Sequence, residues 1–196
     1  MTKLKLEKLI NKQKGYITTQ DAKKAGIHRE YLTMLIEEEK LIRTLSGVYQ
    51  SPDVFEDMLY ALQKKKKRMI YSHETALYLH GYSDRDLNIY SVTFPTGYNT
   101  TQVAQANLKK YTIKTSLFDL GKSTIMSPYG NEIVVYDKER TICDIVRSRN
   151  RIEKQIFIDG MKKYARDSKK DLNKLSFYAK QMGIDNVLRK YMEILL

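Results

Sequence analysis

Cysteine is nearly absent from this chain, and long apolar runs are absent altogether. Cys143 is the only cysteine among 196 residues, so no internal disulfide can form, and we expect a reducing compartment. No uninterrupted apolar stretch approaches the length that spans a membrane. The first ten residues, MTKLKLEKLI, alternate charge with leucine and lack the apolar core and cleavage site of a signal peptide. We therefore expect a cytoplasmic protein without a membrane partner.

The sequence also lacks the motifs that mark common catalytic and cofactor sites. Gly121-Lys122-Ser123 resembles the end of a Walker A loop, but the required glycine at position 116 is Ser116. There is no G-x-S-x-G, no paired-cysteine motif and no G-x-G-x-x-G. His73 and His80 are seven residues apart and do not have the H-E-x-x-H spacing of a zinc site. We predict no enzymatic activity, no cofactor and no metal.

Positive charge is plentiful. Lys and Arg number 35 against 23 Asp and Glu, which gives a formal net charge of +12. Such an excess favours polyanionic partners, because cations that neutralise phosphates release condensed counterions. Five consecutive cations occupy positions 64–68, where they are either the solvated end of a helix or contacts to phosphate.

The stretch from Gly15 to Gln50 has the pattern of a helix-turn-helix. Thr18 is placed to cap a helix, and Asp21 follows at the capping-box spacing. Gly26 is suited to end that helix, since a left-handed conformation is easy without a Cβ. A second helix then follows, with an inward stripe that comprises Tyr31, Leu32, Leu35 and Ile36.

A two-stranded ribbon is predicted directly after these helices. The apolar period changes from about 3.6 to about 2 over Leu41–Leu45, and Val48-Tyr49 follows after a turn at Ser46-Gly47. Two helices and such a wing form a winged helix-turn-helix, whose second helix fits the major groove of DNA. Winged helices also serve as protein-protein modules, which is the alternative. The candidate DNA contacts are Thr18, Thr19, His28, Arg29, Glu30, Thr33, Lys40, Arg43 and Thr44.

The remaining chain predicts a second domain. Ser51-Pro52-Asp53 is expected to cap a helix whose buried face includes Phe55 and Leu59, and the domain boundary follows the basic run. Strands are expected at 87–94, 111–118, 125–126 and 133–136, and helices at 138–147, 152–165, 171–182 and 185–195. The predicted fold is α+β, with a winged helix-turn-helix domain at 1–65. A domain at 69–196 follows, with a small, mostly antiparallel sheet and several C-terminal helices.

A charged pattern, D-x-E-R-T-x-x-D, begins the first of those C-terminal helices. Arg140 and Asp144 lie one helical turn apart, on one face, so they are placed to form an ion pair. The pair either fixes the helix on the sheet or belongs to a functional surface. Cys143 lies on the apolar side of the helix and is assigned to the core.

Several segments together resemble the AbiEi antitoxins of type IV, abortive-infection toxin-antitoxin pairs. They are R-x-x-x-G-V-Y at 43–49, S-H-E-T-A-L-x-L-H-G at 72–81, F-P at 94–95 and D-x-E-R-T-x-x-D at 137–144. The resemblance extends over essentially the whole chain. It implies a phage-defence antitoxin whose winged helix binds inverted repeats in its own promoter and represses transcription. It also implies that the C-terminal domain counteracts a nucleotidyltransferase toxin without a stable complex. The candidate residues in that domain are His73, Glu74, Asp137, Arg140 and Asp144.

Two other functions remain open from the residues. One is a winged-helix regulator whose C-terminal domain senses a ligand or a protein, with no toxin. The other is a nucleic-acid-processing enzyme that uses Asp84, Asp86 or His73.

Overall fold

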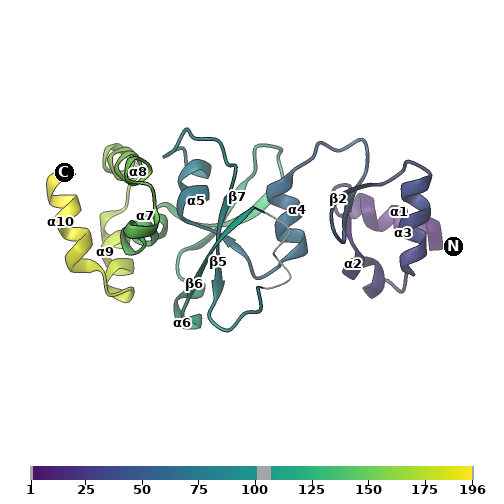
Figure 1. Cartoon of the computed structure of the whole chain (residues 1–196), viewed down its shortest axis with the longest axis horizontal. Helices are drawn as coiled ribbons and strands as arrows, with labels where there is room; N and C mark the ends of the chain where they lie inside the picture. Colours follow the sequence, from purple (N-terminus) through teal and green to yellow (C-terminus); the bar gives the residue numbers. More distant parts are fainter. Residues whose placement is uncertain (1, 101–106, 196) are drawn as a thin grey trace. The chain divides into compact units, whose positions relative to one another are not determined.

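The computed structural model describes residues 2–100 and 107–195, and it has an α+β fold, as predicted (Figure 1). The chain divides into two compact units. The first unit consists of Met1–Lys67 together with Met126–Ile133, and the second of Arg68–Ile125 together with Val134–Leu196. The first unit is thus built from two segments that are far apart in the sequence.

The first unit has the predicted helix-turn-helix and wing. Its sheet has the order β1-β3-β2, and both pairings are antiparallel. Strands β2 and β3 were predicted from the sequence, whereas β1 was not, because a three-residue strand is too short to establish a period of two. The elements are α1 (Thr2–Lys12), β1 (Tyr16–Thr18), α2 (Thr19–Lys24), α3 (Arg29–Glu37), β2 (Ile42–Leu45), β3 (Val48–Gln50) and α4 (Met58–Lys65).

Fewer residues of α3 are buried in the core of this unit than its apolar stripe predicts. Leu32 and Leu35 are buried, whereas Ile36 is half-buried and Tyr31 is exposed at its edge. Both residues belong to α3 and flank the two leucines that pack into the core. The prediction for Phe55 was wrong: its exposed fraction is 83%. Phe55 precedes α4, so helical spacing does not apply to it.

Asp57, rather than Asp53, caps α4. Its carboxylate accepts the backbone N–H of Tyr60 at 3.0 Å and the side-chain amide of Asn131 at 2.9 Å, and Ser127 Oγ also donates to it. The side chain is fully buried. Because a buried carboxylate is stable only when it is hydrogen-bonded, the turn at 127–131 is part of the core of the first unit.

Most of a five-stranded sheet with the order β6-β5-β4-β8-β7 belongs to the second unit, while Met126 of β7 and residues 132–133 of β8 are counted with the first. The sheet is mixed rather than mostly antiparallel, since β4 pairs with β8 and β5 with β6 in parallel. Residues 96–107 separate β5 from β6, and a link of about a dozen residues permits a parallel crossover as readily as a hairpin. The strands are β4 (Ile70–Tyr71), β5 (Tyr90–Pro95), β6 (Leu108–Ile113), β7 (Lys122–Met126) and β8 (Glu132–Tyr136).

Two helices of this unit come between its strands in the sequence. Helix α5 (His73–Leu79) follows β4. The predicted strand at 111–118 was half wrong, because its second half is the short helix α6 (Thr115–Phe118). Alternation of apolar residues over eight positions does not distinguish a strand from a strand followed by one helical turn.

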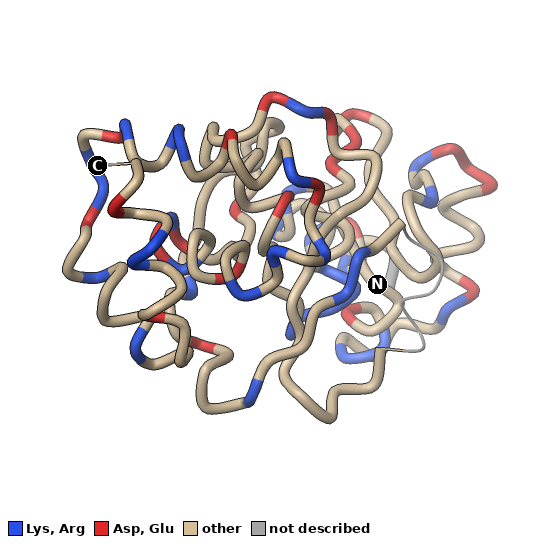
Figure 2. The backbone as a smooth tube through the Cα atoms, turned by 60° about the vertical axis from the view of Figure 1, so that its left-hand side comes forward, with Lys and Arg blue, Asp and Glu red and all other residues tan. Residues whose placement is uncertain are grey.

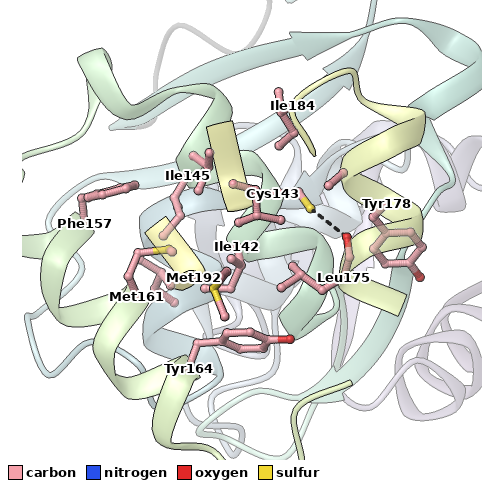
Figure 3. Close-up of a cluster of buried hydrophobic side chains, with 14 of the residues drawn as sticks. Ile142, Cys143, Ile145, Phe157, Met161, Tyr164, Leu175, Tyr178, Ile184 and Met192 are labelled. Carbon is pink, nitrogen blue, oxygen red and sulfur yellow. Dashed lines mark hydrogen bonds between the residues drawn. The ribbon is translucent and has the colours of Figure 1, made fainter. Parts of the chain in front are cut away.

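The C-terminal helices gather on one side of this sheet (Figure 1) and enclose the largest apolar cluster. Figure 3 shows that Cys143 lies inside this cluster, where its thiol donates to the carbonyl of Leu175 at 3.8 Å. The assignment of Cys143 to the core is therefore confirmed. The helical elements are α7 (Lys138–Arg147), the 3-10 turn η2 (Arg149–Arg151), α8 (Lys154–Arg166), α9 (Leu172–Gln181) and α10 (Asp185–Leu195).

Replacement of Asp57 by alanine should destabilise the protein by about 2–4 kcal/mol. The change removes a helix cap and leaves the buried donors of Ser127 and Asn131 unpaired. Asp53→Ala is the matched control, because Asp53 is exposed and should change the free energy of unfolding by less than about 0.5 kcal/mol. Urea denaturation of both variants measures the difference, and equal losses would contradict this role of Asp57.

Candidate nucleic-acid interface

Helices α2 and α3 form a turn that projects the N-terminal end of α3. The capping box predicted at Thr18 is confirmed, because its Oγ accepts the backbone N–H of Asp21 and Asp21 accepts the backbone N–H of Thr18. Gly26 follows α2 with φ of +70°, so the chain reverses there without the strain that a Cβ brings. α3 then begins at Arg29.

The outward face of α3 carries four exposed candidate residues, which are His28, Arg29, Glu30 and Thr33. His28 Nδ1 lies 3.4 Å from Glu30 Oε2, and both side chains are exposed. Arg29 makes no such internal contact in the described chain. Arg29 is therefore a free cation at the start of the helix that would face base edges.

The other end of α3 is acidic. Glu37, Glu38 and Glu39 are all exposed there, and Lys40 pairs with Glu38 at 2.8 Å. Carboxylates repel phosphate and are unfavourable at a helix C-terminus. The electrostatics thus favour contact of DNA with the N-terminal half of α3, and they place Lys40 in an internal ion pair.

The wing is fixed to α2 at its tip. The backbone N–H of Thr19 donates to the carbonyl of Gly47 at 3.0 Å, and its hydroxyl donates to the same carbonyl at 3.4 Å. Thr44 donates its hydroxyl to Gln50 Oε1 at 2.8 Å. Arg43 is exposed, with its guanidinium carbon 5.7 Å from the centre of the Tyr49 ring. Of the predicted wing residues, Arg43 is the one whose charge faces solvent.

The structure thus divides the nine predicted contacts into two groups. The hydroxyls of Thr18, Thr19 and Thr44 are engaged within the unit, so they organise the helix-turn-helix and wing. Sequence reasoning missed the link between Thr19 and Gly47, because it joins segments about 30 residues apart. The exposed group comprises His28, Arg29, Glu30, Thr33, Lys40 and Arg43.

Basic and acidic residues alternate along the backbone rather than separating into one basic and one acidic half (Figure 2). The basic run at 64–68 is partly packed. Lys64 donates to Gln13 Oε1 at 2.6 Å, and burial lowers its pKa below the usual value. Lys67 and Arg68 are exposed. The run therefore combines a packed helix end with two solvent-facing cations.

His73, in the second unit, is the centre of a chain of hydroxyl groups. Its Nδ1 lies 2.9 Å from Ser72 Oγ and its Nε2 lies 3.1 Å from Ser148 Oγ, while Thr93 donates to Ser72 Oγ at 2.8 Å. The ring stacks on Tyr111 with centroids 3.4 Å apart. If Thr93 donates to Ser72 and Ser72 to Nδ1, the proton of the neutral ring is on Nε2. This ring is buried in the second unit.

The other four candidate residues of this unit are also engaged in the fold. Glu74 accepts from Lys109 and from Ser91 Oγ. Asp137 caps α7 by accepting the N–H of Arg140 at 2.8 Å. Arg140 and Asp144 pair at 3.1 Å, and both are buried. The structure thus favours the first of the two interpretations of this pair, a fixed helix, over a functional surface.

The second unit has a pocket that two loop carboxylates line. Asp84 and Asp86 line a pocket of about 670 Å³ together with Glu74, Lys109 and Ile89. Lys163 pairs with Asp84. Within residues 2–100 and 107–195, no three His, Cys, Asp or Glu side chains are arranged to hold a metal ion. The same residues contain no helix with the length and apolar character needed to cross a membrane.

Comparison with known proteins identifies the N-terminal region. Residues 5–52, which run from α1 to the end of the wing, match the family described as "Transcriptional regulator, AbiEi antitoxin". This region is of the AbiEi type. The match confirms the resemblance to AbiEi antitoxins over the residues that it covers. All nine predicted DNA contacts are among the matched residues.

The fold of the whole chain is similar to a solved structure, the crystal structure of the RV2827C protein from Mycobacterium tuberculosis. The TM-score is 0.65 at 13% sequence identity, and the similarity covers 97% of this chain and 74% of that one. At this identity the likeness concerns the fold alone. The comparison with curated proteins found no match.

The protein should lose stability as pH falls below about 6.5. Burial lowers the pKa of His73 well below its usual value, and the nearby Arg147 lowers it further. Burial also lowers the pKa of His80. Because the unfolded chain binds protons that the folded chain excludes, each histidine contributes a slope of up to about 1.4 kcal/mol per pH unit.

His73→Asn removes one of these groups and suits its left-handed backbone, φ +50°. The variant should show a smaller loss of unfolding free energy between pH 7 and pH 5 than the original protein. His28→Gln, at an exposed position, is the control and should retain the original pH dependence. Chemical denaturation at each pH measures this, and an unchanged slope for His73→Asn would contradict the assignment.

Proposed function

We propose that this protein is an AbiEi antitoxin with two roles, those of a transcriptional autorepressor and of an antagonist of a nucleotidyltransferase toxin. The observation that carries the proposal is the match of residues 5–52 to the AbiEi regulator family. The exposed Arg29 and Arg43, on α3 and on the wing of this segment, support a DNA-binding role. The proposed target is an inverted repeat in the promoter of its own operon.

In this proposal the N-terminal half of α3 enters the major groove. Arg29 reads a base edge, and Thr33, one turn further along the same face, makes a weaker contact. Arg43, and Lys40 if it leaves Glu38, contact phosphate beside the groove. The threonines at 18, 19 and 44 act indirectly, since their hydroxyls hold the turn and the wing in place.

The antitoxin role is assigned to the region at 69–196, and DNA binding to the region at 1–65. This division by sequence has one exception, because residues 126–133 belong to the first compact unit. His73, Asp137, Arg140 and Asp144 are engaged within the second unit, so they support neutralisation by maintaining the fold. Glu74 is half-buried and lines the pocket of about 670 Å³.

That pocket also favours a second candidate function, a regulator with a ligand-sensing C-terminal domain and no toxin. Its volume is within the range of small-molecule sites, roughly 300–1,000 Å³. Its lining is rich in charges that are already paired, namely Glu74 with Lys109, Arg85 with Glu153 and Asp84 with Lys163. A polar ligand without a large net charge fits such a lining best.

The two arginines should affect DNA binding in different ways. Arg29→Ala should relax sequence preference at one base position by about 1–3 kcal/mol, because a bidentate pair with guanine is lost. Arg43→Ala should weaken binding to all sequences alike and should flatten the slope of log K against log salt by about 0.9. Competition assays with altered sites, repeated at several salt concentrations, measure both quantities.

The two variants are controls for each other, since each removes one exposed cation from the same unit. If Arg29→Ala weakened every sequence equally, Arg29 would be a phosphate contact and not the reader. If the slope were unchanged in Arg43→Ala, the wing would not touch the backbone of the DNA.

A separation of the two roles tests the proposed function as a whole. In the full chain, Arg29→Ala combined with Arg43→Ala should abolish repression of a promoter reporter yet still protect cells from the nucleotidyltransferase encoded beside it. Arg140→Ala should weaken protection and lower thermal stability together, because the buried Asp144 is left unpaired.

Protection that fails in the double arginine variant, with the protein still folded, would show that the winged helix takes part in neutralisation. If no neighbouring nucleotidyltransferase gene existed, the ligand-sensing regulator would replace the antitoxin as the preferred function.

A further inference from the structure

The two edge strands of the five-stranded sheet differ in whether side chains bond to their outward backbone groups. At the β6 edge, Arg147 Nη2 donates to the carbonyl of Thr112 and Arg151 Nη2 donates to the carbonyl of Lys110, both at 3.3 Å. These side chains block the outward carbonyls of β6. The opposite edge is β7. No side-chain donor to the backbone of Lys122–Met126 is found among the described residues, and none of these five has a further interaction there.

The outward-facing groups of β7 follow from its hairpin with β8. The backbone N–H of Ser127 donates to the carbonyl of Asn131 at 2.7 Å, so Ser127 faces β8. Since backbone groups alternate between the two sides of a strand, those of Lys122, Thr124 and Met126 point away from β8. The N–H of Lys122 is taken by the carbonyl of Asp119 at 3.2 Å. The groups that remain are the N–H groups of Thr124 and Met126 and three carbonyls.

The side chains of this edge are exposed as well. Lys122, Thr124 and Met126 are exposed, whereas Ser123 and Ile125 are half-buried. Unpaired N–H and C=O groups along a strand are a template for another strand. A five-residue edge with one lysine is short, so it favours a partner strand of matching length and charge.

We propose that β7 pairs with β7 of a second copy of this chain, antiparallel and with a two-fold axis at Thr124. The axis places Thr124 opposite Thr124, and Lys122 of each copy opposite Met126 of the other. In this register the outward N–H of Thr124 donates to the Thr124 carbonyl of the other copy. The N–H of Met126 donates to the carbonyl of Lys122, and the blocked N–H of Lys122 is not needed.

Self-pairing is favoured by the charge pattern of β7. The positive charge is at one end of the strand, so an antiparallel partner keeps the two Lys122 ammonium groups apart, whereas a parallel copy would set them side by side. Paired threonines and a lysine stem over methionine are favourable cross-strand neighbours. The contact is small, so the pair should be weak and concentration-dependent.

Cysteine cross-linking of the full chain tests the register. Thr124 is exposed, so Thr124→Cys supplies an accessible thiol. The native Cys143 is fully buried and should not compete with it. Directly opposite residues have Cα atoms about 5.5 Å apart, within the range of a disulfide. With oxidised glutathione, Thr124→Cys should form a disulfide-linked dimer at least tenfold faster than Lys122→Cys. Two Lys122 positions are separated by four residues along the strands, or about 14 Å.

An equimolar mixture of Lys122→Cys and Met126→Cys should cross-link between the two variants, because the register sets these positions opposite each other. Sedimentation velocity of the unmodified protein should show a mass that rises with concentration. The experiment contains no DNA, so its result is independent of the proposed repressor function.

Equal and slow cross-linking of Thr124→Cys and Lys122→Cys would overturn the proposal. So would a dimer of Lys122→Cys that forms as fast as that of Thr124→Cys, since this would require another register. A mixed disulfide of Thr124→Cys with a co-expressed protein, without the homodimer, would overturn self-pairing and assign the edge to a foreign strand.

Discussion

A buried guanidinium group imposes the strictest requirement on the second unit. Arg140 has no exposed surface, and a charge removed from water depends on an opposite charge and on hydrogen bonds. Among the described residues, Arg140 Nη2 and Asp144 Oδ2 have no hydrogen-bond partner, so the other contacts of the pair must hold it. Arg140 Nε donates to Asp144, and its Nη1 donates to the carbonyls of Leu117 and Leu120 at 2.8 and 2.6 Å. The Tyr136 ring lies 4.1 Å from the guanidinium carbon. One side chain thus connects α7, β8 and the segment between α6 and β7.

The aliphatic part of the same side chain explains a glycine. A Cβ on Gly121 would lie 2.5 Å from Arg140 Cβ, and the φ of Gly121 is +74°. Both the space and the backbone conformation therefore require glycine where the chain passes Arg140 on its way into β7. Of Gly121-Lys122-Ser123, which resembles a phosphate loop, only Gly121 is in a turn, beside the buried Arg140, and Lys122 and Ser123 begin β7.

The first unit has an analogous centre of opposite charge. Asp57 is buried and gathers donors from α4 and from the turn at 127–131, about 70 residues away in the sequence. Buried charges in both units thus serve the scaffold. The charges free to meet a partner are on exposed helical and wing positions such as Arg29 and Arg43. Of the five candidate residues of the second unit, His73, Arg140 and Asp144 are buried and Asp137 caps α7, whereas Glu74 is half-buried and lines a pocket.

Local sequence by itself determined much of the helix-turn-helix and wing. Thr18, Asp21 and Gly26 set the limits of α2 through hydrogen bonds and a backbone conformation that span only a few residues, and the Ser46-Gly47 turn sets the wing in the same way. Such interactions depend on neighbours in the chain, so spacing reveals them. The start of α7 at Asp137 and the pairing of Arg140 with Asp144 were predictable for the same reason.

Tertiary structure decided the features that depend on distant partners. The choice of Asp57 over Asp53 as the cap of α4 depends on Ser127 and Asn131, which no local pattern connects to it. The parallel pairing of β5 with β6 and the exposure of Phe55 likewise depend on how remote segments pack. The spacing of residues in the sequence shows which side chains share a face. The segment that covers this face is determined only in the complete fold, by the burial of apolar area and of charge.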